Sequence, residues 1–222
     1  MRRGFTLLEV MIVVSIVAIT AAIGWGTMDK HLPRYRLMSA SKGMKADLVN
    51  LQALAVQTNR ETRLRLLDSA GSCEDLDTWG GQYVLEVGNR SSGSTSWEVI
   101  PMDAEEDGSD DDQTEGWMDL GEDGNRKARF VCLQEWEELT GPGTDSEDSV
   151  VFSPRGWLRN PVSDFSSSGY VELELVNLIA ASDGINDRVT IKISRAGMVR
   201  METSLGRQGP DGAAGTGLSS ER

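Results

Sequence analysis

The stretch Gly4-Phe5-Thr6-Leu7-Leu8-Glu9-Val10 opens an apolar run that reaches Ile23, and the rest of the chain is organised around it. Two arginines precede the run, and between Phe5 and Met28 the only formal charge is Glu9. This length matches the roughly 20 apolar residues that an α-helix needs to cross a bilayer. Basic residues before a spanning helix favour a cytoplasmic N-terminus. The stretch therefore predicts a transmembrane helix, residues 5–28, that leaves the rest of the chain on the far side of the membrane.

Glu9 is the unusual residue of this run, because a carboxylate inside a spanning helix costs about 2.5–3.5 kcal/mol on insertion scales. Such a group indicates a function and needs a counter-ion. Cleavage after Gly4 would give Phe5 an α-amine, which is protonated at neutral pH. In axially stacked copies of the helix, the amine of one copy can face the Glu9 carboxylate of the next and neutralise it. The stretch therefore predicts an assembly element as well as an anchor.

These residues resemble the class III signal of type IV pilins and type II secretion pseudopilins. The resemblance implies that prepilin peptidase removes residues 1–4 as a leader by cutting between Gly4 and Phe5. It also implies that Phe5 becomes N-methylated and that Glu9 serves in assembly. A secretory signal peptide would instead lose its apolar run, for which Thr20-Ala21-Ala22 is a passable cleavage site. The glutamate in the apolar region and the glycine at its basic boundary argue against that alternative; a plain uncleaved anchor is the third.

The helix is expected to continue beyond the anchor as an amphipathic half, residues 29–59, with bends near Gly24, Gly26 and Pro33. Apolar or small residues recur there at every third or fourth position, the spacing of a helix that buries one stripe on a domain. These residues are Leu37, Ala40, Met44, Leu48, Leu51 and Ala55.

From residue 60 the apolar period changes to two, which predicts β-strands. Because Leu64 alternates with Arg63 and Arg65, the first strand is expected to be half exposed. The expected strands are 60–67, 82–87, 97–100, 129–133, 150–153, 170–176, 189–194 and 198–202, the last pair forming a hairpin with its turn at 195–197. No helical crossovers separate them, so they should pair mainly antiparallel. The predicted fold class is α+β: a long helix, membrane-spanning in its first half, packed on a mainly antiparallel β-sheet head, residues 60–202.

Two segments lack this alternation. Residues 103–148 are expected to form a long acidic loop, because Asp and Glu dominate 103–123 without any Lys or Arg and repel one another. Residues 203–222 are rich in Gly and Ser, which predicts a disordered tail. The whole chain carries 35 acidic and 22 basic residues, a net charge of −13, which disfavours non-specific binding to nucleic acid.

Cys73 and Cys132 would lie in an oxidising compartment, where a disulfide between them is expected and two separate buried thiols are the alternative. Calcium is the best metal candidate, because it prefers carboxylate oxygens. The candidate ligands are Asp107, Asp110, Asp111, Asp112, Asp119 and Asp123 in the acidic loop, and Asp183, Asn186 and Asp187 around a turn. No segment has the alternation of an EF-hand, so solvated loops are the favoured interpretation and no cofactor is expected.

The sequence is poor in catalytic groups. Its single histidine, His31, falls beside the membrane, and it has no nucleophile elbow, phosphate-cradling loop or zinc-spaced Cys/His cluster. An enzyme is therefore not expected. Some relatives of the pilin class bind DNA through basic residues of the head. The corresponding candidates here are interrupted by acidic residues, so no nucleic-acid partner is expected; they are Arg126, Lys127, Arg129, Arg195, Arg200 and Arg207.

The order of segments after the anchor resembles the H-type pseudopilin (GspH/FimT) group, including residues 150–156 and 189–202. The resemblance implies a minor pilin or pseudopilin in the bacterial inner membrane, with a periplasmic head, that later takes a place at a filament tip. Its implied partners are prepilin peptidase, the inner-membrane assembly platform, other minor subunits and the major subunit. A type IV pilus and a type II secretion pseudopilus both stay open. The alternative from another class is a membrane-anchored head that binds DNA or a surface ligand.

Overall fold

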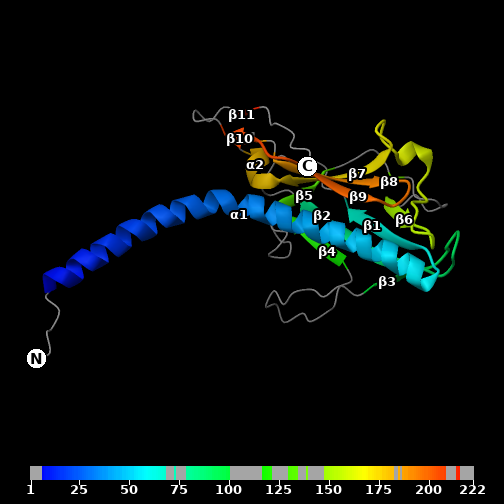
Figure 1. Cartoon of the computed structure of the whole chain (residues 1–222), viewed down its shortest axis with the longest axis horizontal. Helices are drawn as coiled ribbons and strands as arrows, with labels where there is room; N and C mark the ends of the chain where they lie inside the picture. The colour runs from blue at the N-terminus through cyan, green and yellow to red at the C-terminus, as the bar shows by residue number, and fades with distance from the viewer. Residues whose placement is uncertain are drawn as a thin grey trace, which may run out of the picture.

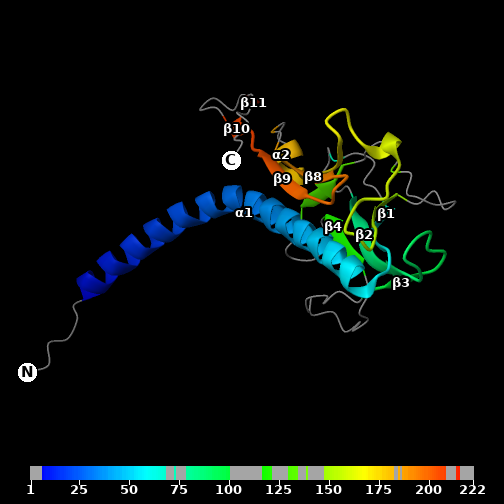
Figure 2. The ribbon, with the colours of Figure 1, turned by 45° about the vertical axis from the view of Figure 1, so that its right-hand side comes forward.

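The computed structural model describes residues 7–68, 73, 79–100, 117–121, 130–134, 139, 148–182, 185, 187–208 and 214–215. Of residues 21–31, 67–68, 79, 117, 119, 121, 182, 207–208 and 214–215 it describes the backbone alone. Helix α1, Leu7–Thr58, sets the long axis of the molecule (Figure 1). Its 52 residues extend about 78 Å at 1.5 Å per residue. The helix runs unbroken through Pro33 and is curved along its length (Figures 1 and 2). It ends where Asn59 adopts a left-handed φ of 55°, a common way to stop a helix.

The first sheet of the head has the order β3-β2-β1-β6, and β4 pairs with β2 off this path. Both β3 and β4 use the same edge of β2: β3 pairs with its end at Glu86–Gly88, and β4 with its beginning at Trp79–Val84. Every pairing is antiparallel. The strands are β1 (Thr62–Asp68), β2 (Trp79–Gly88), β3 (Trp97–Val99), β4 (Trp117–Gly121) and β6 (Ser149–Phe152).

The second sheet has the order β5-β7-β8-β9 and is also antiparallel throughout. Along β8 the buried residues are Val189, Ile191 and Ile193, which gives the alternation of a strand with one face on the core. On the other face Lys192 lies 2.8 Å from Glu202 and 3.7 Å from Glu172, so charges pair across neighbouring strands. The strands are β5 (Val131–Leu133), β7 (Tyr170–Asn177), β8 (Arg188–Ser194) and β9 (Val199–Ser204).

The core lies between α1 and the two sheets. The stripe of α1 that faces the head is fully buried, and it meets the apolar faces of β1, β6, β7 and β8 in one continuous cluster. Burying one such side chain contributes about 1.5–3 kcal/mol, so this stripe fixes the helix on the head. Its members are Leu37, Met44, Leu48, Leu51 and Ala55. The α+β class and the antiparallel head predicted from the sequence are thus confirmed.

The hairpin between β8 and β9 turns where it was expected. Gly197 has a φ of +84°, and its N–H donates to Ser194 O at 2.8 Å. A Cβ at this position would lie 2.0 Å from Gly156 O and 2.2 Å from Gln52 Nε2. Glycine is therefore required twice, for its backbone conformation and for the close approach of the next loop and the helix.

Several elements differ from the prediction. Strand β4 lies inside the segment expected as an acidic loop, because it pairs with β2 rather than relying on its own apolar pattern. Strand β9 continues to Ser204, and the two-residue strands β10 (Arg207–Gln208) and β11 (Ala214–Gly215) pair within the segment expected as a tail. Two short helices were not predicted: the 3-10 helix η1 (Val162–Asp164) and α2 (Leu178–Ser182).

The expectation that β1 is half exposed was wrong for Arg63. Strand β1 is central in its sheet, between β2 and β6, and the Arg63 side chain is only 8% exposed. Its Nε donates to Glu86 Oε2, the residue directly opposite in the strand register, and its guanidinium lies 4.2 Å from the ring centroid of Trp97. A buried guanidinium is tolerated because it is paired and covered by an aromatic face.

Candidate functional site

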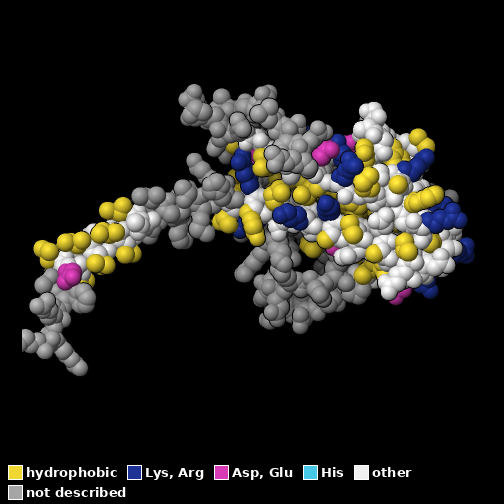
Figure 3. All heavy atoms as spheres, in the orientation of Figure 1, with side chains coloured by type: hydrophobic (Ala, Val, Ile, Leu, Met, Phe, Trp, Pro, Cys, Tyr) yellow, Lys and Arg dark blue, Asp and Glu magenta, His cyan; other side chains and the backbone are white. Residues whose placement is uncertain are grey.

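The first turns of α1 form the largest exposed apolar surface of the described chain. Every described side chain from Leu7 to Thr20 is exposed, and no element of the head covers them (Figure 3). Contiguous apolar surface of this size marks a site that binds a membrane or another protein. We call this surface the apolar helix half. Its large residues are Leu7, Leu8, Val10, Met11, Ile12, Val13, Val14, Ile16, Val17 and Ile19, each at least 50% exposed.

The polar residues of the apolar helix half do not interrupt it. The Ser15 hydroxyl donates to Met11 O at 2.8 Å, and the Thr20 hydroxyl lies 3.0 Å from both Ile16 O and Val17 O. These bonds satisfy the hydroxyl donors within the helix itself. Neither residue therefore needs a polar partner outside the helix, and both are compatible with an apolar environment.

Glu9 is the charged exception, and it lies in the first turn of α1. A carboxylate there is favoured by the partial positive charge of a helix N-terminus. Its side chain is exposed among exposed apolar neighbours. The arrangement displays one negative charge on a surface that is otherwise suited to a dry environment.

The residues expected to be processed, Gly4 and Phe5, lie outside the described residues, so cleavage and methylation stay predictions. The same holds for the partnership between Glu9 and the Phe5 amine. No helical segment among the described residues combines the length and the apolar character of a membrane crossing. The predicted span, residues 5–28, includes residues that the structure does not describe.

Further along α1, after the apolar helix half, an ion pair joins the helix to the head. Arg34 Nε donates to Asp187 Oδ2 at 2.7 Å, and Arg34 Nη2 donates to Asp187 Oδ1 at 3.2 Å and to Gly206 O at 2.6 Å. The Gly206 N–H donates to Asp187 Oδ1 at 2.8 Å. Asp187 is almost fully buried, and these donors compensate its charge. We call this group the helix clamp. The sequence did not predict it, because 153 residues separate its two charged members.

A second polar contact joins the middle of α1 to the first sheet. Tyr83 Oη donates to Asp47 Oδ2 at 2.9 Å. Burial raises the pKa of the Asp47 carboxyl above its ordinary value, although the bond from Tyr83 acts in the opposite direction. The pKa of Tyr83 is raised well above its ordinary value, first by burial and then by the nearby Asp47 charge. Both groups therefore keep their protons to a higher pH in the folded protein than in the unfolded chain.

Cys73 and Cys132 form a disulfide, with their Cα atoms 5.8 Å apart. The bridge lies in a small apolar cluster with Val176 and Leu178, separate from the main core. Phe130 packs against this cluster, and the Arg36 guanidinium of α1 lies 5.5 Å from its ring centroid. The disulfide thus secures the part of the head that faces the beginning of the docked helix.

The calcium candidates divide between described and undescribed residues. Asp187 is described, and its oxygens accept bonds from Arg34 and Gly206 in the helix clamp. No group of three or more His, Cys, Asp or Glu suited to a metal ion occurs within the described residues. The side chain of Asp119 and the remaining candidates lie outside the described part; these are Asp107, Asp110, Asp111, Asp112, Asp123, Asp183 and Asn186.

The basic residues considered for DNA are likewise only partly described. Arg195 lies in the β8–β9 turn, with its guanidinium 5.1 Å from the ring centroid of Phe165, and Arg200 lies within β9 opposite Lys192. Arg126, Lys127, Arg129 and the side chain of Arg207 lie outside the described residues. The structure therefore places two of the six candidates, one at the end of the second sheet and one within it.

Comparison with known proteins adds three findings. No curated protein matches the chain. The chain is similar to the type IV minor pilin FimU from Pseudomonas aeruginosa strain PAO1, with 15% identity and a TM-score of 0.36 over 82% of this chain and 98% of that one. Residues 1–25 match the family described as the prokaryotic N-terminal methylation motif. The match includes the segment that opens the apolar helix half.

Proposed function

We propose that this chain is a minor subunit of a type IV pilus or of a type II secretion pseudopilus. Prepilin peptidase cleaves between Gly4 and Phe5, Phe5 is N-methylated, and the head is held at the bacterial inner membrane on its periplasmic side. The observation that carries the proposal is the N-terminal methylation motif of residues 1–25, which leads directly into the apolar helix half. In the same helix the following stripe forms the core of the head.

In this proposal the apolar helix half has two successive environments. Before assembly the lipid covers it, and in a filament the helices of neighbouring subunits cover it. Glu9 then pairs with the Phe5 amine of an adjacent subunit, which removes an isolated charge from a dry environment. The hydroxyls of Ser15 and Thr20 need no partner in either place, because they bond to their own helix. The subunit primes or caps the filament together with other minor subunits, on an inner-membrane assembly platform and in contact with the major subunit.

The first test is the intact mass of the protein isolated from its native host. The proposal expects a polypeptide that begins at Phe5 and carries one added methyl group. Replacement of Gly4 by Val should leave the full-length mass, because the bulky side chain occupies the cleavage position. A wild-type protein that starts at Met1, or one trimmed beyond Ala22, would refute the proposal.

The second test separates anchoring from assembly. Glu9→Gln should keep the protein in the membrane fraction but reduce its recovery in sheared filaments by about tenfold or more, because the intersubunit ion pair is lost. Ser15→Ala is the matched control, since it removes another polar group of the same surface whose bond is internal. Normal incorporation of the Glu9 variant would contradict the role assigned to this carboxylate.

A further inference from the structure

Four connections meet at the end of the head that lies opposite the N-terminus (Figures 1 and 2). They are residues 59–61 between α1 and β1, 89–96 between β2 and β3, 153–161 after β6, and 195–198 between β8 and β9. Hydrogen bonds hold them together: the Glu61 N–H donates to Arg90 O at 2.8 Å, and the Leu158 N–H donates to Arg195 O at 3.0 Å. We call the surface formed by these four connections the distal face.

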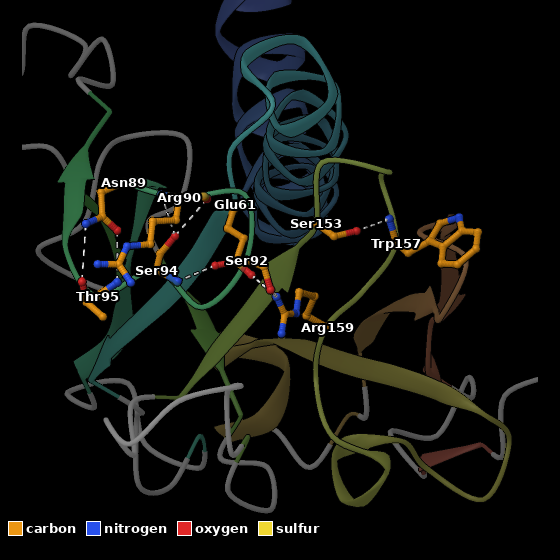
Figure 4. A network of polar contacts seen from close by, with 9 residues as sticks. All are labelled: Glu61, Asn89, Arg90, Ser92, Ser94, Thr95, Ser153, Trp157 and Arg159. Carbon is orange, nitrogen blue, oxygen red and sulfur yellow. Dashed lines mark hydrogen bonds and ion pairs between the residues drawn. The ribbon is translucent and has the colours of Figure 1, made fainter.

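The distal face is basic although the chain as a whole is acidic. Its charged residues are Arg60, Arg90, Arg155, Arg159, Arg195 and Glu61. Glu61 is buried, and its carboxylate accepts bonds from Arg159 Nη1 and from the Ser94 N–H at 2.7 Å (Figure 4). Asp164, just beyond the third connection, is also buried and accepts a bond from Asn160. Glu61 and Asp164 are therefore internal, so the exposed charges of the four connections are all cationic, while Glu98 of β3 is exposed two residues beyond the second connection.

Four arginines are left to face the solvent after this pairing. Arg60, Arg90, Arg155 and Arg195 are all exposed, and among the described residues none of them has an acidic partner within ion-pair distance. Within the second sheet, by contrast, Lys192 is paired with Glu172 and Glu202, and Arg188 is paired with Glu174. In a chain of net charge −13, four arginines without acidic partners on one end form a localised positive patch.

Apolar side chains accompany these arginines. Trp157 is 55% exposed and Met198 is 48% exposed, and both belong to the distal face. The backbone N–H of Trp157 donates to Ser153 Oγ at 3.2 Å. The indole ring points away from that bond (Figure 4). Arginine and tryptophan are the residue types most enriched in the energetic centres of protein–protein interfaces. The composition thus matches a protein-binding surface with an aromatic anchor.

We propose that the distal face docks on an acidic segment of a neighbouring protein subunit. The inference rests on the proposed function, because in a filament the end opposite the membrane anchor faces the adjacent subunit or the tip. Charge complementarity is available within such assemblies, because the sequence of this chain itself contains an acidic stretch, residues 103–116, which is dominated by Asp and Glu and contains no Lys or Arg. Duplex DNA is disfavoured as the occupant, because the overall charge of −13 repels a polyanion that extends beyond the patch.

The direct test measures binding of a labelled peptide with the sequence of residues 103–116, which ends before β4, to the full-length protein in detergent micelles, by fluorescence anisotropy. The triple variant Arg60→Gln, Arg90→Gln, Arg155→Gln should bind about tenfold more weakly, since each exposed ion pair contributes a small increment. The matched control is Arg36→Gln, Lys42→Gln, Lys45→Gln in α1, which changes the net charge equally away from the distal face and should stay within about twofold of wild type. Trp157→Ala should weaken binding independently of salt, because it removes apolar contact.

Equal loss in both triple variants would overturn the proposal, because net charge alone would then explain the binding. Failure of the wild-type protein to bind the peptide at low salt would overturn it as well. Binding of a short DNA duplex that the peptide does not displace would replace it with a nucleic-acid site. The mass and incorporation tests of the proposed function do not depend on this peptide, so either proposal can fail while the other stands.

Discussion

Tyr83 of strand β2 donates its hydroxyl hydrogen to Asp47 of helix α1, and both partners have a raised pKa because they are buried. The folded protein therefore holds protons that the unfolded chain releases more readily. Stability contributed by such groups is present below the unfolded pKa and is lost as the pH rises through the folded pKa.

For Tyr83 the loss of stability with rising pH begins near the ordinary tyrosine pKa of about 10. We expect the free energy of unfolding to fall steeply above that pH, because ionisation would place a second negative charge beside Asp47. In Tyr83→Phe the decline should be shallower, while stability at neutral pH should drop by about 1–3 kcal/mol as the half-buried Asp47 carboxylate loses its donor. Urea unfolding at both pH values measures the two effects. An equally steep alkaline decline in the Phe variant would contradict this assignment.

The Asp47 carboxyl predicts a second change of stability with pH, in the acidic range. Its raised pKa means that stability falls as the pH increases from below the ordinary value of about 4 through the folded value. Asp47→Asn keeps an acceptor for Tyr83 but cannot ionise, so it should remove this part of the pH dependence. Its stability at neutral pH should be unchanged or slightly higher, since the cost of burying a charge is gone. Unfolding curves between pH 3 and 7 test the expectation against the wild type.

The helix clamp should be costly to break. Asp187→Ala leaves Arg34 and the Gly206 N–H without their acceptor, and we expect a loss of about 2–4 kcal/mol in the free energy of unfolding. Glu202→Ala is the matched control, because it removes one carboxylate from an exposed ion pair with Lys192 and should cost under about 1 kcal/mol. If both variants lost the same free energy of unfolding, the helix clamp would contribute no more to stability than an exposed ion pair, contrary to this prediction.

The Cys73–Cys132 disulfide closes a loop with a sequence separation of 59 residues. On the chain-entropy argument it stabilises the folded protein by about 4 kcal/mol. Replacement of both cysteines by Ser, or addition of reductant, should lower the denaturant midpoint. Reductant should have no further effect on the double variant, which serves as its own control. An identical midpoint for the oxidised and reduced wild type would count against a role in stability.

Three glycines provide a graded test of the close packing at the β8–β9 turn. Gly197→Ala should cost more than about 1 kcal/mol, because the new Cβ meets Gly156 O and Gln52 Nε2 at a positive φ. Gly93→Ala carries a positive φ of 64° but meets no atom within 4 Å, so it should show only the conformational cost. Gly43→Ala lies in α1 with open space around it and should stabilise by up to about 1 kcal/mol. Any other order of the three would contradict the contacts described.

The sequence predicted those features whose pattern is local. The spacing of Leu37, Met44, Leu48, Leu51 and Ala55 identified the buried stripe, and alternation identified the strands of the second sheet. It failed where pairing depended on distant residues. Strand β4 is short and depends on β2 as its partner, and the burial of Arg63 depends on Glu86 and Trp97 from other strands.

The candidate site divides in the same way. Glu9 and its apolar surroundings could be read from consecutive residues, because one helix contains them all. The helix clamp and the distal face could not, since each is assembled from segments that meet only in the folded head. Opposite charges at paired positions, such as Arg63 and Glu86, become a usable signal only once the register of the strands is known.

The continuity of α1 from its exposed beginning to its buried end has a mechanical consequence. A force applied to the amino end of α1 is transmitted along this single helix. It reaches the head at Arg34, where the helix clamp joins α1 to Asp187, next to β8 of the second sheet. Beyond that point the load acts along the axis of the buried stripe, so the side chains from Leu37 to Ala55 resist together in shear instead of peeling away one after another. The contact between α1 and the head is therefore loaded in shear when the helix is pulled along its axis.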